Sequence, residues 1–287
     1  MKTKILTLLS IVPFLFACSH ASGYSGITNK SYGKYGERNL YDVYFPLDVK
    51  STSLVFYIHG GGWMAGNKGY AAKNDAIVYN DGYAYGALNY RYISENSSYE
   101  AIFEDITKCL TSIKKEASKR RITLNKVLFY GGSAGAHLSM LYAYKMKDVS
   151  PIEVGCVVSY SGVFDFTDPE LYKNDNFNPI YEEWFSYLAG SPMKVNDIEA
   201  SRDALMNISP VNYLDSACPT IIAHGDSDEL FPLVLANTFN SKLEEKAIPH
   251  HMVVFNNSGH GLENDPDAMS QVEEYIKEYK ALYLVKE

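Results

Sequence analysis

The sequence predicts a single α/β domain with a mostly parallel β-sheet and helices on both of its faces. Two observations lead to this prediction. Short apolar runs typical of buried strands alternate along the chain with amphipathic segments typical of helices. In addition, a G-x-S-x-G motif at residues 131–135 lies between one such strand and one such helix. The chain has 287 residues, of which 46% are hydrophobic, and this is enough to build one sizeable core.

The elements are expected in a regular order along the chain. Strands are expected at 40–45, 54–58, 83–90, 127–130, 152–160, 219–224 and 251–255, and helices at 71–79, 99–118, 136–141, 233–243 and 268–284. The helix over 99–118 is supported by apolar residues that recur with a 3.6-residue period. Strands that alternate with helices imply parallel neighbours joined by helical crossovers.

One segment, residues 164–210, interrupts this alternation. It is rich in Asp, Asn, Pro and aromatic residues, lacks a clear strand, and has a helical pattern at 181–188. Ligands bind at the carboxyl ends of the strands in open α/β sheets, and long loops in compact domains are usually functional. We therefore expect a lid-like insertion over these strand ends. The alternative is surface packing without contact to a ligand.

The N-terminus has the pattern of an export signal. Lys2 and Lys4 precede an apolar run that is too short to span a bilayer, which predicts a signal peptide at 1–17, a tether at 18–34 and the folded domain at 35–287. Residues 15–18 resemble a bacterial lipobox, so lipidation of Cys18 is expected. Cleavage by the ordinary signal peptidase is the alternative, because Phe16 is bulky. We expect an exported lipoprotein of the periplasm, outer membrane or cell surface, attached to the membrane only through its lipid.

Charge and cysteine content narrow the class of protein. Loss of Lys2 and Lys4 with the signal peptide would change the formal net charge from −8 to −10, and an acidic chain without a basic cluster is a poor candidate for binding nucleic acid. The remaining cysteines, Cys109, Cys156 and Cys218, are odd in number and far apart. This argues against a disulfide framework and a zinc site. No metal and no cofactor are expected.

Ser133 is the candidate nucleophile. A tight strand-to-helix turn lifts a serine Oγ clear of the sheet, and such a turn needs small neighbours, as Gly131, Ala134 and Gly135 provide. This context is typical of the nucleophile elbow of α/β hydrolases, in which the chain order is serine, acid, histidine.

The candidate base and acid follow the last two predicted strands. His260 lies in a Ser-Gly-His-Gly segment, and Asp228 lies in the segment His-Gly-Asp-Ser-Asp at 224–228. Consecutive strand ends would bring both to the edge of the sheet that carries Ser133. Asp226 and Asp165 are the alternative acids.

A glycine-rich segment, His-Gly-Gly-Gly-Trp at 59–63, is the candidate oxyanion loop. Glycines leave backbone N–H groups accessible to an approaching oxygen, so Gly61 and Gly62 are expected to form the hole with Ala134. The alternative, a phosphate cradle, lacks the lysine–serine pair of a Walker motif. Candidate substrate contacts are Trp63, which either walls the acyl pocket or packs beneath the loop, and the aromatic residues Tyr90 and Trp184.

Taken together, the segments 59–63, 131–138, 224–228 and 258–260 resemble the α/β-hydrolase esterases. The most similar branch is that of the hormone-sensitive-lipase-like and feruloyl/acetylxylan-type esterases, near kynurenine formamidase. Gly132 before the serine differs from the lipase-like members and favours the feruloyl/acetyl esterase side. The resemblance covers roughly residues 35–285 and implies hydrolysis of carboxylic esters through an acyl-enzyme without metal or cofactor.

The sequence therefore predicts a serine carboxylesterase. Its expected substrates are small-molecule or oligosaccharide esters of short acyl groups or aromatic acids. Three alternatives stay open: a prolyl-oligopeptidase-like serine peptidase, an arylformamidase, and a surface carbohydrate-binding lipoprotein with an inactive triad.

Overall fold

The computed structural model of the chain describes residues 23–71 and 81–285. The predicted signal peptide, Cys18 and all but the first residue of the predicted 71–79 helix lie outside these ranges. The strands are β1 (Tyr24–Ser31), β2 (Leu40–Pro46), β3 (Ser51–Ile58), β4 (Ala84–Leu88), β5 (Thr123–Gly132), β6 (Glu153–Tyr160), β7 (Thr220–Gly225) and β8 (His250–Phe255). The α-helices are α1 (Tyr99–Lys119), α2 (Ala134–Lys145), α3 (Asn178–Ala189), α4 (Arg202–Ile208), α5 (Leu233–Glu245) and α6 (Pro266–Tyr283).

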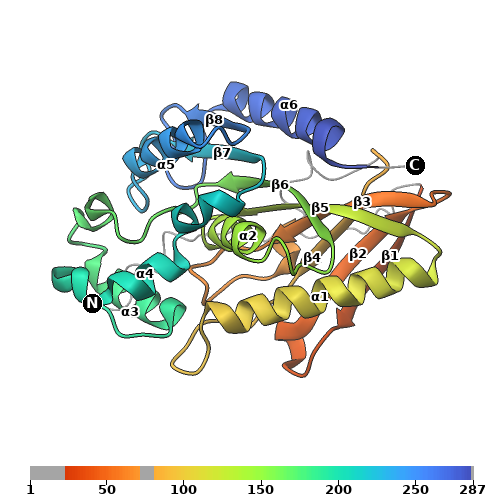
Figure 1. The fold of residues 1–287 in the computed structure, drawn as a ribbon, viewed down its shortest axis with the longest axis horizontal. Helices are drawn as coiled ribbons and strands as arrows, with labels where there is room; N and C mark the ends of the chain where they lie inside the picture. Colours follow the sequence, from red (N-terminus) through yellow and green to blue (C-terminus); the bar gives the residue numbers. More distant parts are fainter. Residues whose placement is uncertain (1–22, 72–80, 286–287) are drawn as a thin grey trace.

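The strands form one eight-stranded sheet, which confirms the predicted fold class (Figure 1). Its order is β1-β2-β4-β3-β5-β6-β7-β8, and every neighbouring pair from β4 to β8 is parallel. The two antiparallel pairs, β1–β2 and β2–β4, lie at one edge of the sheet. The parallel strands therefore place their carboxyl ends at one edge of the sheet, where the motifs predicted to be functional follow them.

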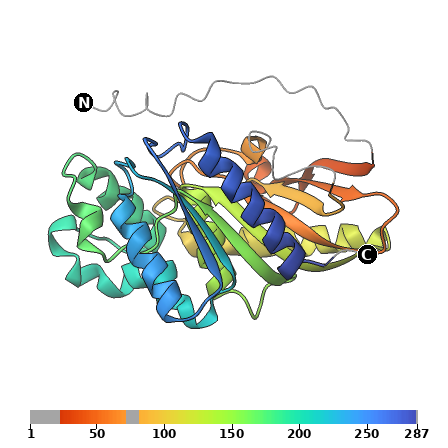
Figure 2. The same cartoon turned by 90° about the horizontal axis from the view of Figure 1, so that it is seen from above.

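Helices cover both faces of the sheet, as expected for parallel strands joined by crossovers. Alternate residues of β3 point to opposite faces, so that Phe56 packs in one core with α1, α2 and α5, and Tyr57 packs in a second core with α6. Viewed from above, α6 crosses the sheet on one side while α1 lies on the other (Figure 2). The two cores hold the central strands, and hence their carboxyl ends, rigidly in place.

The N-terminal boundary of the domain differs from the prediction. Part of the predicted tether, residues 24–31, forms the edge strand β1, which pairs with β2 through a register shift between Ile27 and Lys30. Most side chains of β1 are at least partly exposed, so the segment lacks the apolar run by which the inner strands are recognised. The folded domain therefore begins before residue 35.

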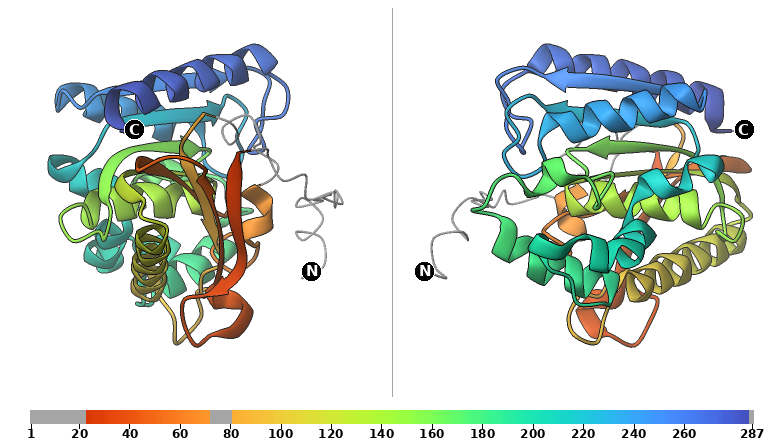
Figure 3. Two further views of the ribbon diagram at one scale, coloured as in Figure 1. Left: turned by 90° about the vertical axis from the view of Figure 1, so that its right-hand side faces the viewer. Right: turned by 60° about the vertical axis from the view of Figure 1, so that its left-hand side comes forward.

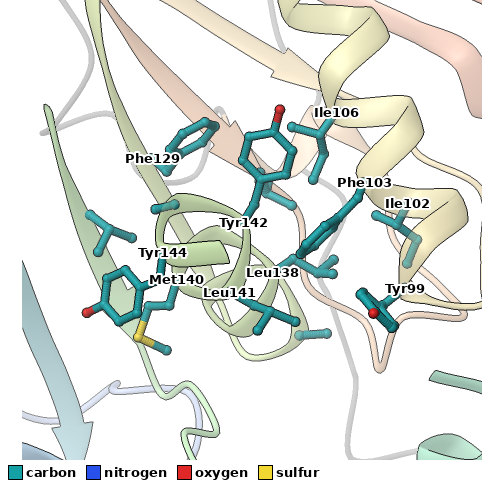
Figure 4. Packing of buried hydrophobic residues seen from close by; sticks show 14 of the residues in the cluster. Tyr99, Ile102, Phe103, Ile106, Phe129, Leu138, Met140, Leu141, Tyr142 and Tyr144 are labelled. Carbon is teal, nitrogen blue, oxygen red and sulfur yellow. The ribbon is translucent and has the colours of Figure 1, made fainter. Parts of the chain in front are cut away.

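The helix that follows Ser133 is buried along almost its whole length. All α2 residues from Ala134 to Tyr144 are buried, which is typical of a helix enclosed on every side. Figure 4 shows Tyr142 of α2 lying between Phe103 of α1 and Phe129 of β5. Its ring centroid is 5.2 Å from that of Phe103 and 5.4 Å from that of Phe129. This packing anchors α2, the helix that begins directly after Ser133, in the core of the domain.

The predicted insertion at 164–210 has helices and no strand among the described residues. Besides α3 and α4 it contains the 3-10 turns Pro169–Tyr172, Val195–Asp197 and Glu199–Ser201. In Figures 1 and 3, α3 and α4 lie together beyond one end of the sheet. No helix in the described part of the chain has the length and apolar character needed to span a membrane.

Candidate active site

Ser133 occupies a strained turn between β5 and α2. Its φ and ψ angles are 55° and −123°, a combination that a serine rarely adopts and that costs on the order of 1–3 kcal/mol. The turn runs close to β3, because a Cβ on Gly131 or Gly135 would lie 2.4 or 2.0 Å from the carbonyl oxygen of Ile58. Glycine is therefore required at both positions, and the half-buried Ser133 is held where the sequence motif predicts it.

Asp228 and His260 form a direct pair at the carboxyl ends of β7 and β8. Oδ2 of Asp228 is 2.8 Å from Nδ1 of His260, and the aspartate side chain is fully buried. Its other oxygen, Oδ1, accepts hydrogen bonds of 2.9 Å from the backbone N–H groups of Leu230 and Phe231. Since a carboxylate accepts on both oxygens, His260 carries its proton on Nδ1 and leaves Nε2 as a base.

The second ring nitrogen of His260 is free to act on a ligand. Nε2 is buried and has no hydrogen-bond partner among the described residues, Ser133 included. Catalytic hydrogen bonds are often long in the absence of substrate and shorten when it binds. The structure thus pairs the predicted acid with the predicted base, and it places the base without a bond to the predicted nucleophile.

Neither alternative acid contacts His260. Asp226 accepts hydrogen bonds from the backbone N–H groups of Asn257 and Ser258, at 3.0 and 3.2 Å, and these bonds lower the pKa of its carboxyl group. Asp165 accepts from the N–H and hydroxyl groups of Thr167. Asp226 therefore shapes the loop that carries His260, while Asp165 caps a turn at the start of the insertion.

The glycine-rich loop after β3 lies directly against the elbow. A Cβ on Gly60 would be 2.5 Å from the carbonyl oxygen of Gly132 and 3.5 Å from Cβ of Ser133. Gly61 and Gly62 have φ angles of 114° and 58°, which favour glycine. Ala134 is the first residue of α2, and the first amides of a helix have no partner within it. The loop that carries Gly61 and Gly62 therefore starts against the elbow, and Ala134 directly follows Ser133.

Two of the predicted substrate contacts support this loop from below. Trp63 and Tyr90 have no exposed surface, so neither ring presents a face to a ligand in this structure. The Tyr90 hydroxyl donates to the His59 carbonyl at 2.8 Å, and its ring stacks on the His59 imidazole at 4.1 Å. Burial lowers the pKa of His59 to about 4. Of the two roles considered for Trp63, packing beneath the loop is the one that its burial fits.

His137 joins three segments around the elbow, a role that the sequence did not reveal. The indole N–H of Trp63 donates to its Nδ1 at 3.1 Å, so Nε2 carries the proton and donates to the carbonyl of Ile208 at 2.7 Å. Burial lowers the pKa of His137 to about 4, which keeps it neutral. From the sequence, its position four residues after Ser133 indicated only that it lies one helical turn beyond the serine.

Trp184 of α3, the third predicted substrate contact, touches the oxyanion loop. A Cβ on Gly62 would lie 2.8 Å from Cη2 of the Trp184 ring, and this ring is only half-buried. The insertion therefore reaches the carboxyl end of β3, as predicted from its position in the sequence. It also brings an exposed aromatic surface to the rim of the site.

An open pocket of about 520 Å³ lies along α3, and none of the predicted catalytic or oxyanion residues lines it. It is lined by Tyr187, by hydroxyl groups and by acidic side chains, among them Glu95 and Glu183. In the described part of the chain, no group of three or more His, Cys, Asp and Glu side chains is arranged to hold a metal ion.

A serine at a strand-to-helix elbow, an aspartate–histidine pair and a glycine loop, all at the carboxyl edge of a parallel sheet, define an α/β hydrolase. The BD-FAE family model matches residues 41–243, and the dienelactone hydrolase family model matches residues 206–283. The chain belongs to the BD-FAE family, and its fold is the α/β-hydrolase fold of carboxylic ester hydrolases.

Similar proteins include two from Mycobacterium tuberculosis. The probable carboxylic ester hydrolase LipM is 29% identical over 75% of this chain and 51% of its own length, and the esterase LipQ is 22% identical over 75% and 52%. The chain thus spans about half the length of these relatives. Among solved structures, a truncated carbohydrate esterase from gut microbiota has a TM-score of 0.73 at 18% identity, covering 92% of this chain and 99% of that one.

Proposed function

We propose that this protein is a serine carboxylic ester hydrolase that works through an acyl-enzyme. The Asp228–His260 pair, together with a serine held in a strained elbow, is the observation that supports the proposal most directly. It joins the two side chains that must act together on a serine proton, and it leaves Nε2 of His260 without a competing partner. The family of the chain favours the same chemistry.

In the proposed reaction, Nε2 of His260 takes the Ser133 proton while Oγ attacks the ester carbonyl carbon. The N–H groups of Gly61, Gly62 and Ala134 stabilise the resulting oxyanion. When the tetrahedral intermediate breaks down, His260 gives its proton to the leaving alcohol. A water molecule then attacks the acyl-enzyme, His260 takes a proton from it, and Ser133 recovers that proton as the acid leaves.

Hydrolysis of p-nitrophenyl acetate tests this proposal, with Ser133→Ala as the control. We expect turnover in the wild type and a loss to background in the variant. A fluorophosphonate probe should label the wild type on the peptide that contains residue 133. Turnover that survives Ser133→Ala, or labelling elsewhere, contradicts the proposal.

For the substrate, we propose esters of short acyl groups or aromatic acids carried on sugars. The half-buried ring of Trp184 at the rim suits stacking against a sugar or a phenolic acid. The pocket along α3, lined by Tyr187, hydroxyls, carboxylates and Lys194, suits a group rich in hydroxyls. Kinetics on acetylated and feruloylated oligosaccharides, compared with dipeptidyl-naphthylamides and an N-formyl arylamine, would test this substrate class. Higher kcat/KM on either nitrogen-linked substrate contradicts it.

We also propose that the protein is exported and anchored through a lipid on Cys18, a residue outside the described ranges. The proposal rests on the charged and apolar pattern of residues 2–17 and on the lipobox-like segment 15–18. Metabolic labelling with a palmitate analogue should tag the wild type and not Cys18→Ala. Labelling that persists in the variant contradicts lipidation at this residue.

A further inference from the structure

The turn that carries Asp228 is held by hydrogen bonds to the backbone of Leu230 and Phe231. The N–H groups of Leu230 and Phe231 donate to Oδ1 of Asp228, each at 2.9 Å. The carbonyl oxygens of the same two residues also accept hydrogen bonds, from the Tyr181 hydroxyl and from Nε2 of His224. The orientation of the carboxylate therefore depends on two side chains that do not touch His260 through a hydrogen bond.

Tyr181 comes from α3, in the insertion, and not from the sheet. It has no exposed surface, and its ring stacks between Phe177 and Phe185, with centroid separations of 6.0 and 5.0 Å. Stacking of this kind holds the ring in one orientation, so the hydroxyl has a fixed position above Leu230. Loss of the Tyr181 hydroxyl would leave the half-buried carbonyl of Leu230 without this donor, which weakens its hold on the turn.

His224, the last residue but one of β7, bonds to the other carbonyl. Its Nε2 lies 2.7 Å from the oxygen of Phe231 and 3.4 Å from Oδ2 of Asp228, and its ring is fully buried. Because Nε2 of His224 carries the proton in this arrangement, the partial positive charge of this N–H group also lies near the Asp228 carboxylate. One donor therefore belongs to the sheet and the other to the insertion.

The same helix contacts the opposite side of the candidate site. Trp184 lies one turn after Tyr181 and touches Gly62 of the oxyanion loop. The helix α3 thus bridges the segment after β3 and the segment after β7. Between these two segments lie the strands β5 and β6, with Ser133 at the end of β5.

We propose that Tyr181 is a positioning residue that acts through Asp228, and that α3 is a fixed part of the catalytic site and not a mobile cover. The proposal rests on the proposed function, because it assigns Asp228 as the acid. Without the Tyr181 hydroxyl, Leu230 is free to turn, its N–H bond to Oδ1 weakens, and the carboxylate holds the His260 imidazolium less well.

The test compares Tyr181→Phe with Tyr172→Phe. Each change removes a hydroxyl of the insertion that donates to a backbone carbonyl. The Tyr172 hydroxyl donates to Phe166, at 2.6 Å, and not to the Asp228 turn. Phenylalanine keeps the ring and its stacking, so both variants are expected to fold. We expect Tyr181→Phe to lower kcat by about tenfold with little change in KM, and Tyr172→Phe to leave kcat within about twofold.

A double-mutant cycle with Asp228→Asn separates a positioning role from a structural one. If Tyr181 acts through the carboxylate, Tyr181→Phe lowers kcat by less than about twofold once Asp228 is already asparagine. Full additivity of the two changes in kcat overturns the proposal.

A spectroscopic measurement keeps this test separate from the proposed function. The His260 Nδ1 proton, hydrogen-bonded to Asp228, should give a low-field proton NMR signal that is lost in His260→Gln. We expect Tyr181→Phe to shift or broaden this signal, and Tyr172→Phe to leave it in place. A wild type without ester hydrolysis would refute the proposed function alone, while a signal unchanged in Tyr181→Phe would refute the role of Tyr181 alone.

Discussion

Replacing Asp228 by asparagine is the sharpest test of the candidate site, because the structure fixes which way the new amide must point. Oδ1 of Asp228 accepts two backbone N–H groups, each at 2.9 Å. The oxygen of an asparagine would keep both bonds, so its NH₂ group would face Nδ1 of His260. An NH₂ group donates and does not accept, so Nδ1 would become the acceptor and the proton would move to Nε2.

A proton on Nε2 prevents His260 from accepting the Ser133 proton. In a serine–histidine–aspartate triad this change of tautomer lowers kcat by about 10⁴-fold, or about 5.4 kcal/mol of transition-state stabilisation. We expect a loss of this size for Asp228→Asn on p-nitrophenyl acetate, with Ser133→Ala setting the floor. The KM should change little, because the binding surface at the rim is not altered.

Asp226→Asn is the matched control, two residues away in the same loop. Asp226 is exposed, and its two oxygens accept from the backbone N–H groups of Asn257 and Ser258, so an asparagine can keep only one of these bonds. Neither bond involves His260. We expect kcat to stay within about threefold of the wild type. If Asp226→Asn costs more activity than Asp228→Asn, the assignment of the acid is wrong.

Two further predictions concern the oxyanion loop and its support. Gly62 has a φ of 58°, and the Cβ of Gly62→Ala would lie 2.8 Å from the Trp184 ring, so this change should lower kcat by about 10²–10³-fold. The control is Gly36→Ala, which has a similar φ of 57° but open space around it and should leave kcat unchanged. Equal effects of the two changes on kcat would contradict the role of the loop. Burial lowers the pKa values of His59 and His137 from 6.5 to about 4, so the unfolded chain binds more protons than the folded one below pH 6.5. The free energy of unfolding should therefore fall as the pH falls from 6.5 towards 4, by up to about 3 kcal/mol for each histidine. Urea unfolding at pH 7 and pH 4.5 measures this loss, which should be smaller in His137→Gln; an equal loss in the variant would rule out His137 as a source.

The candidate catalytic residues could be predicted because the residues next to each of them in the sequence form a recognisable pattern. Ser133 has glycines that only a tight turn requires, and His260 and Asp228 follow apolar runs that end as strands do. Parallel strands place such ends together, so the sequence could indicate that the three residues share one edge of the sheet. The strand β1 could not be predicted in the same way, because an exposed edge strand lacks a continuous apolar run.

Tertiary structure alone decided which polar groups meet across that edge. Asp226 and Asp228 are both plausible acids in sequence, and only the path of the loops gives one to His260 and the other to the backbone at 257–258. Trp63 and Tyr90 are aromatic residues near a catalytic motif, yet their burial makes them supports of the loop. Local sequence sets the shape of a turn or the face of a strand, whereas contacts between segments tens of residues apart depend on how the whole chain packs.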